Sequence, residues 1–221
     1  MSKKNISQEK IIQSFISSAF EKSAGATSLA DIADSLEIKK ASLYNHFESR
    51  EAMYDATIYH CGKEIKSIHF LPEKTLDSIK ANKYSPSSLF KKLISRFFEL
   101  YGNEPLFEMY VFVHTEQYFN LEALQIVQQE FTCYTDEIKS ILDEFVALGK
   151  LQKKTEKELK DISVTITSII FHQRDYYVAE RKETVRQNPE SGAGSLFALP
   201  TDETAVNRTI KLVEGILKSI S

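Results

Sequence analysis

The stretch IKKASLYNHFESRE, residues 38–51, surrounds a small apolar core with many hydrogen-bond donors. Leu43 and Phe47 are its anchors, and they predict a very short helix from about residue 40 to residue 46 that only neighbouring helices can hold in place. Such a helix can present its N-terminal end to a DNA major groove. The alternative is that the donors only face water. The faces left free carry Lys40, Ala41, Ser42 and Asn45.

Two helices are predicted before this stretch and one after it. Apolar residues at helical spacing predict a helix over residues 7–23, with Gly25 as its C-terminal stop. A second apolar stripe runs from Leu29 to Leu36, and Thr27 or Ser28 can cap that helix. Ser49 is predicted to cap a further helix over residues 50–69. With a tight turn at Glu37–Ile38, the pattern is that of a helix-turn-helix.

The span TSLADIADSLEIKKASLYNHFESREAM, residues 27–53, adds a linear motif to this pattern. Its marks are Asp31-Ile32-Ala33, then Leu43-Tyr44 and His46-Phe47, then the basic Arg50. The motif resembles the N-terminal DNA-binding domain of the TetR family of bacterial transcriptional regulators. The resemblance covers roughly the first 60 residues. Two positions depart from the family pattern, since Glu37 replaces the usual turn glycine and Lys39 replaces a small hydroxylated residue.

The resemblance implies a set of DNA contacts. It places the Tyr44 hydroxyl on a phosphate. The alternative is that this tyrosine is a half-buried core aromatic without a role in DNA binding. Lys40 and Arg50 are interpreted as phosphate anchors, or else as solvated cations. Base readout is expected from lysine, serine and asparagine side chains, with alanine against a thymine methyl group. The candidate DNA-binding residues are Thr27, Ser28, Lys39, Lys40, Ala41, Ser42, Tyr44, Asn45, His46 and Arg50.

Beyond about residue 84 the chain becomes rich in aromatic side chains at helical spacing. Such stripes usually form a core. However, an apolar cavity with a few polar groups also holds small ligands, and the family binds effectors in its C-terminal domain. The effector is therefore expected to be a small apolar or aromatic molecule. Its candidate lining residues are Phe98, Tyr101, Tyr110, His114, Phe131, Tyr134 and His172.

Two final helices are predicted over residues 156–184 and 204–220. The resemblance implies that they pair with their copies in a second subunit, so a homodimer is expected. The dimer would present two recognition helices about one DNA turn apart, ~34–36 Å. The linker at 186–203 contains an apolar Leu196-Phe197-Ala198-Leu199 run that is a candidate for docking on the partner subunit.

Composition limits the function classes. Gly 7 and Pro 5 are few for 221 residues, which favours a mostly helical chain. The net charge is −3, and residues 1–67 hold nine cationic and nine anionic side chains, so any DNA contact must come from a local patch. Cys61 and Cys133 fit neither a disulfide framework nor a clustered zinc site. With no signal peptide or span-length apolar run, a cytoplasmic protein without a membrane role is expected.

A catalytic role is not predicted. His114-Thr115-Glu116 resembles part of the zinc deaminase motif, but the P-C-x-x-C partner is missing from the sequence. No cofactor and no metal are expected. The sequence therefore predicts an all-α protein, with a DNA-binding domain at 1–67 and an effector-binding and dimerisation domain at 68–221. The predicted function is that of a TetR-like repressor released by a small molecule. The alternative is a protein of the same fold that senses no small molecule.

Overall fold

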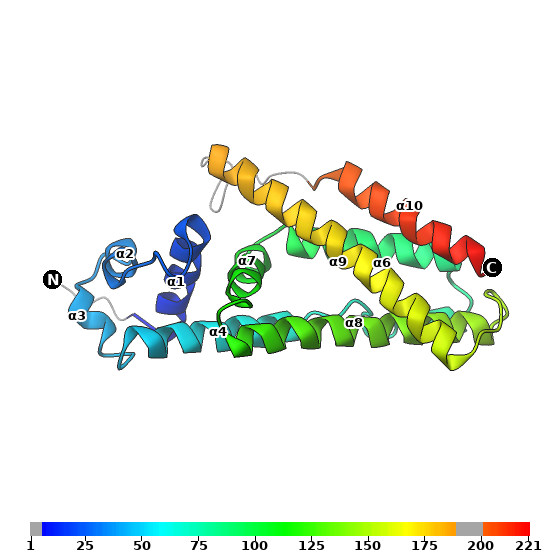
Figure 1. Cartoon of the computed structure of the whole chain (residues 1–221), viewed down its shortest axis with the longest axis horizontal. Coiled ribbons are helices and arrows are strands. Elements are labelled where there is room, and N and C mark those ends of the chain that lie inside the picture. The colour runs from blue at the N-terminus through cyan, green and yellow to red at the C-terminus, as the bar shows by residue number, and fades with distance from the viewer. Residues whose placement is uncertain (1–5, 189–200) are drawn as a thin grey trace. The chain divides into compact units, whose positions relative to one another are not determined.

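A computed structural model describes residues 6–188 and 201–221. Within these ranges the chain forms ten α-helices and no strand, as the all-α prediction required (Figure 1). The chain divides into two compact units. The N-terminal unit comprises the described residues up to Ser67 together with Pro105–Gln128, and the C-terminal unit comprises those of Ile68–Glu104 and Gln129–Ser221.

The first four helices confirm the predicted helix-turn-helix. Ser7, Ser28 and Ser49 each accept a backbone N–H at the start of a helix, so three helix starts are fixed by side-chain caps. The prediction that Gly25 stops the first helix is wrong, because the helix ends at Lys22 and Ser23 takes the positive φ of 82°. The helices are α1 (Gln8–Lys22), α2 (Leu29–Ser35), α3 (Lys40–Leu43) and α4 (Arg50–Lys66).

Helix α7 (Leu106–Glu116) packs in the N-terminal unit. Phe112 meets Phe15 edge-on with ring centroids 5.8 Å apart, and Phe107 meets Phe20 at 5.1 Å. These aromatic contacts join α7 to the helix-turn-helix, and one compact unit comprises both. The domain bounds 1–67 and 68–221 stay predictions.

The C-terminal unit is built from helices whose ends are also capped. Ser85, Thr155 and Asp202 cap α6, α9 and α10, and α10 lies along α6 and α9 (Figure 1). Helix α8 ends at Ala147, and Gly149 just beyond it adopts a φ of 68°. The sequence patterns predicted no bounds for α5, α6 or α7. The helices are α5 (Thr75–Lys80), α6 (Pro86–Tyr101), α8 (Leu121–Ala147), α9 (Glu156–Gln187) and α10 (Glu203–Ser219).

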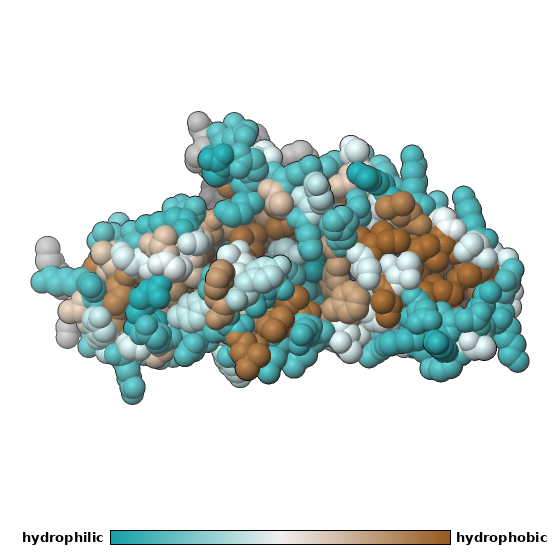
Figure 2. Space-filling model, viewed as in Figure 1, coloured by the Kyte–Doolittle hydropathy of each residue, from teal (hydrophilic) through white to brown (hydrophobic). Residues whose placement is uncertain are grey.

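Helices α9 and α10 bury only part of their apolar side chains within the chain. Val164 and Leu212 are exposed, and Ile169 and Ile216 are half-buried. Figure 2 shows hydrophobic surface over these two helices, on the right of the view. Among the described residues, no helix combines the length and apolar character that a membrane crossing would need. The apolar run at 196–199 lies outside the described residues.

Candidate functional site

Helix α3 presents polar side chains on a buried apolar base. Leu43 is 1% exposed and Phe47 is 8% exposed, so both anchor the short helix as its length requires. Tyr44 is 52% exposed, which leaves its hydroxyl end at the surface. The exposed side chains of this segment are Lys39, Lys40, Ala41, Tyr44 and Asn45, and the half-buried ones are Ser42 and His46. The structure therefore brings seven of the ten predicted DNA-binding residues into one short segment.

The turn between α2 and α3 adopts a left-handed geometry at Glu37, with a φ of 56°. The Ile38 amide donates to the Ala33 carbonyl oxygen at 2.9 Å, and the Glu37 amide donates to the Asp34 carbonyl oxygen at 3.0 Å. The turn thus keeps a geometry that glycine adopts freely, although glutamate stands there. A non-glycine residue in this region costs about 1 kcal/mol. Lys39, at the start of α3, provides no side-chain cap, as its chemistry predicted.

Arg50 turns inward, which corrects its predicted role as a phosphate anchor. Its Nε donates to the Thr27 carbonyl oxygen at 3.3 Å, and its Nη2 donates to the same oxygen at 3.1 Å and to the Ala24 carbonyl oxygen. The guanidinium also lies 5.6 Å from the centroid of the Phe15 ring. Arg50 therefore links the start of α4 to the α1–α2 connection and stabilises the helix-turn-helix from inside.

Thr27 and Ser28 have different roles. Thr27 is 1% exposed and its hydroxyl donates to the Ser23 carbonyl oxygen at 2.8 Å, so its predicted place at the DNA surface is wrong. Ser28 is exposed and caps α2 in a capping box with Asp31. Lys22 lies 2.6 Å from Asp31, and the hydrogen bond from Lys22, with those from Ser28, lowers the pKa of Asp31 to about 2. Only Ser28 of this pair remains a candidate for phosphate contact.

The predicted effector residues fall in both units. Tyr110 and His114 belong to the N-terminal unit, where their rings lie 3.8 Å apart. Within the C-terminal unit, His172 is exposed and meets the exposed Tyr176 edge-on. The remaining four candidates belong to the C-terminal unit, where Tyr101 and Tyr134 form one buried cluster. Exposed His172 lies outside the buried cluster, and a cavity lined by all seven residues stays a prediction.

Tyr101 and Tyr134 pack tightly inside the C-terminal unit. Their hydroxyl oxygens are 3.2 Å apart, and the Tyr134 hydroxyl donates to the Ile68 carbonyl oxygen at 3.0 Å. The Phe97 ring lies 4.7 Å from the Tyr101 ring, and the Phe171 ring stacks on Tyr134 at 5.5 Å. Aromatic rings thus take up the space in which the sequence predicted a ligand cavity.

A buried ion pair stands inside this aromatic cluster, and the sequence analysis missed it. Arg174 Nη1 donates to Glu130 Oε1 at 2.7 Å, with side chains only 1% and 2% exposed. The Tyr101 hydroxyl donates to the same Glu130 oxygen, and burial raises the pKa of Tyr101 well above its usual value, which keeps this donor protonated. The guanidinium lies 3.9 Å from the Phe171 ring centroid. A sequence signal existed, because both charged residues interrupt apolar helix faces one turn from Tyr134 and Ile170.

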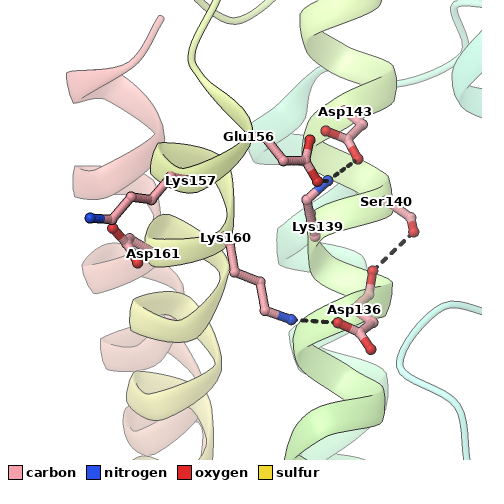
Figure 3. Close-up of a pocket in the computed structure, with 8 residues that line it drawn as sticks. All are labelled: Asp136, Lys139, Ser140, Asp143, Glu156, Lys157, Lys160 and Asp161. Atoms are coloured by element: carbon pink, nitrogen blue, oxygen red, sulfur yellow. Dashed lines mark hydrogen bonds and ion pairs between the residues drawn. The ribbon is translucent and has the colours of Figure 1, made fainter.

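A polar pocket of about 710 Å³ lies between α8 and α9 (Figure 3). Lys139 bridges Asp143 at 2.9 Å and Glu156 at 2.8 Å, and Lys160 pairs with Asp136 at 2.5 Å. Opposite charges thus neutralise one another across the pocket. Its lining is unlike that expected for an apolar effector, and it consists of Asp136, Lys139, Ser140, Asp143, Glu156, Lys157, Lys160 and Asp161.

Comparison with known proteins places this fold. The sequence model of bacterial regulatory proteins, tetR family, matches residues 17–57. The biofilm operon icaADBC HTH-type negative transcriptional regulator IcaR of Staphylococcus aureus is 31% identical over 138 residues, which are 62% of this chain and 70% of IcaR. A transcriptional regulator from Rhodococcus sp. Rha1 superposes with a TM-score of 0.60 at 10% identity, over 97% of this chain and 98% of that one. A TetR transcription regulator from Haloarcula marismortui also superposes with a TM-score of 0.60 at 11% identity, over 96% of this chain and 97% of that one.

The fold and the exposed face of α3 define a helical regulator with an N-terminal helix-turn-helix. The motif at 17–57 and the extended similarity to IcaR then identify the family. The chain belongs to the TetR family of bacterial regulatory proteins and is a transcriptional regulator of that family. Regulators of this family bind DNA operators, act as dimers and are generally non-enzymatic.

Proposed function

We propose that this protein is a homodimeric repressor that binds its operator through α3 and the residues flanking it. The observation that carries the proposal is the division of α3 into two buried anchors, Leu43 and Phe47, and an exposed polar face. The likeness to IcaR, which is named a negative regulator, supports repression as the sign of control. DNA binding belongs to the helix-turn-helix at 1–67, while effector binding and dimerisation belong to the later helices.

The proposed contacts follow from exposure and chemistry. Lys40 and Asn45 are exposed and offer donors suited to guanine and adenine edges respectively, and the Lys40 ammonium also suits a phosphate oxygen. The Tyr44 hydroxyl and the exposed Ser28 at the start of α2 are assigned to phosphate oxygens. Because the net charge of the chain is −3, non-specific attraction is weak and this patch supplies the specificity. The full proposed set is Ser28, Lys39, Lys40, Ala41, Ser42, Tyr44, Asn45 and His46.

Dimerisation is assigned to α9 and α10. Their exposed Val164 and Leu212, with the half-buried Ile169 and Ile216, offer an apolar surface for a second copy. In a two-fold dimer the same surface of each copy meets its equivalent, and the two α3 helices read two half-sites. Ile169→Glu would bury an unpaired charge at such an interface and is expected to yield monomers in light scattering.

The effector is proposed to be a small, mostly apolar or aromatic molecule with one or two polar groups. The aromatic cluster around Tyr101, Tyr134 and the Glu130–Arg174 pair supports this, because it combines ring surfaces with oriented polar groups inside the C-terminal unit. Since rings fill this region, the molecule would bind by shifting the population toward an opened arrangement. Release from the operator follows if, in that arrangement, the distance between the two α3 helices of the dimer no longer matches the two half-sites.

A duplex selected by the wild-type protein from a random DNA library tests the proposal. It should contain two related half-sites, and sedimentation should show two chains per duplex at saturation. A small-molecule screen by thermal shift should then find a ligand that raises the melting temperature and lowers duplex affinity. Selection of one isolated half-site by a single chain would contradict the dimeric repressor. Two half-sites with no ligand in either assay would favour the alternative, a regulator that senses no small molecule.

A further inference from the structure

A second cluster of reactive side chains lies in the C-terminal unit. His69 Nδ1, Cys133 Sγ and a carboxylate oxygen of Glu137 all lie within 4.8 Å of one another. Cys133 and Glu137 are four residues apart on α8, so they share one face of the helix. His69 comes from the connection between α4 and α5. Imidazole, thiolate and carboxylate are the three ligand types that zinc uses in proteins.

Glu137 is held in place by the backbone of the same connection. Its Oε2 accepts the Phe70 amide at 2.8 Å and the Leu71 amide at 3.1 Å. Its Oε1 lies 2.6 Å from His69 Nδ1 and 3.8 Å from Cys133 Sγ. One carboxylate oxygen is therefore anchored, while the other faces the imidazole and the thiol. Outer hydrogen bonds of this kind orient metal ligands and are a usual part of built metal sites.

The backbone of His69 is also fixed. Arg96 Nη1 donates to the His69 carbonyl oxygen at 2.8 Å. The His69 side chain is 55% exposed, against 15% for Glu137, so the cluster is open on the imidazole side. An open side leaves room for a water molecule as a fourth ligand, as zinc sites with three protein ligands have.

We propose that His69, Cys133 and Glu137 form a binding site for a divalent cation of the zinc class. Zinc bonds of about 2.0–2.3 Å place neighbouring ligand atoms roughly 3.3–3.8 Å apart. The three ligand atoms lie within 4.8 Å of one another, and the pairs at 2.6 Å and 3.8 Å span these separations. The mixed sulfur, nitrogen and oxygen set suits Zn²⁺ rather than Mg²⁺ or Ca²⁺, which prefer oxygen ligands alone. On binding, the thiol proton leaves to solvent, the His69 ring carries its proton on Nε2 so that Nδ1 is free to bind, and three metal–ligand bonds form.

The bound cation ties a particular segment of the chain to α8. His69 lies three residues beyond Lys66, the last residue of α4, and α4 starts shortly after the proposed recognition helix. A cation held by His69 on one side and by Cys133 and Glu137 on the other therefore pins the start of the α4–α5 connection. The site does not depend on operator binding, so its test is independent of the proposed function.

The experiment uses full-length, chelator-treated protein titrated with Co²⁺ and with Zn²⁺ alone. Co²⁺ should produce a thiolate charge-transfer band that saturates at one ion per chain and disappears when Zn²⁺ competes. Cys133→Ser should abolish the band, and His69→Asn should weaken Zn²⁺ binding at least about 100-fold, since even outer-sphere changes cost 10–100-fold. The matched control is His172→Asn, which removes another exposed histidine of the same unit and should change nothing.

Hydrogen exchange tests the pinning of the connection. Zn²⁺ should slow exchange over residues 67–71 in the wild type and in His172→Asn, but not in Cys133→Ser. The absence of a charge-transfer band in folded wild-type protein would overturn the site. A band that survives Cys133→Ser would assign the thiolate to Cys61 and overturn it equally. Binding without slower exchange would overturn the pinning.

Discussion

Helix α3 of the N-terminal unit and the aromatic cluster of the C-terminal unit use polar side chains in opposite ways. In the N-terminal unit, α3 buries Leu43 and Phe47 and turns its lysine, tyrosine and asparagine side chains outward. In the C-terminal unit, Glu130 and Arg174 are buried in an aromatic cluster. An outward polar group contributes little to stability and is available for a partner. An inward one stabilises only while its partner is in place. Substitutions of outward side chains should therefore change binding, and substitutions of inward side chains should change stability.

Loss of one member of the buried pair should have the largest effect. Glu130→Gln keeps the shape of the side chain but removes the buried counter-ion of Arg174 and leaves the exposed Asp175 carboxylate, 3.7 Å from Nε. It should lower the free energy of unfolding by about 3–5 kcal/mol. Urea unfolding measures this. Asp136→Asn, on the same helix as Glu130, is the matched control. It breaks the exposed pair with Lys160 of α9 and should cost only about 0–1 kcal/mol.

A double variant separates the loss of one charge of the pair from the loss of both. Glu130→Leu with Arg174→Met removes both charges and should recover most of the stability, because no uncompensated charge remains. Equal losses for Glu130→Gln and Asp136→Asn would show that burial of the pair carries no energetic weight. Inward polar groups would then contribute no more to stability than outward ones do.

Arg50 tests the same contrast within the N-terminal unit. Arg50→Ala removes the hydrogen bonds to the Ala24 and Thr27 carbonyl oxygens and should cost about 1.5–3 kcal/mol of stability. Arg50→Lys should recover little, because an ammonium cannot reproduce the forked geometry. Lys40→Ala, at an exposed position, should leave urea unfolding unchanged.

The salt dependence of DNA affinity gives the second half of this test. The slope of log affinity against log salt should fall by about 1 in Lys40→Ala and stay at the wild-type value in Arg50→Ala. A flattened slope in Arg50→Ala with unchanged stability would restore Arg50 to the phosphate-contacting set. It would also contradict the inward assignment made from its carbonyl contacts.

The sequence predicted the outward polar face of α3, with its anchors and caps, but not the inward contacts. Leu43, Phe47, Ser28 and Ser49 follow local spacing rules, and the structure uses them as anchors and caps. The inward direction of Arg50 could not be predicted, because backbone carbonyl oxygens that accept its hydrogen bonds leave no mark in a sequence. Such contacts depend on how the chain returns to itself.

The long-range features were missed for a related reason. Glu130 and Arg174 lie 44 residues apart and meet only through the packing of α8 on α9. In the same way, Phe107 and Phe112 join the helix-turn-helix through Phe20 and Phe15, about 90 residues earlier in the chain. A helical aromatic stripe predicts burial. It does not predict which unit supplies the opposite surface, so the sequence alone could not divide the candidate effector residues between the two units.

The smallest expected effect concerns the turn before α3. Glu37→Gly should relieve the cost of a φ of 56° and raise the free energy of unfolding by up to about 1 kcal/mol, with part of the gain lost to unfolded-state entropy. Glu48→Gly, at a position without positive φ, should give no gain. A loss of stability in Glu37→Gly would mean that the glutamate side chain contributes more than its backbone strain costs.

If α3 reads DNA with its exposed face, single substitutions on that face should weaken operator binding without changing stability. Fluorescence anisotropy with the selected duplex should show that Lys40→Ala and Tyr44→Phe bind roughly tenfold or more weakly than the wild type, at unchanged stability. Lys157→Ala, an exposed lysine of the C-terminal unit, should bind as the wild type does. Wild-type affinity in both α3 variants would contradict the claim.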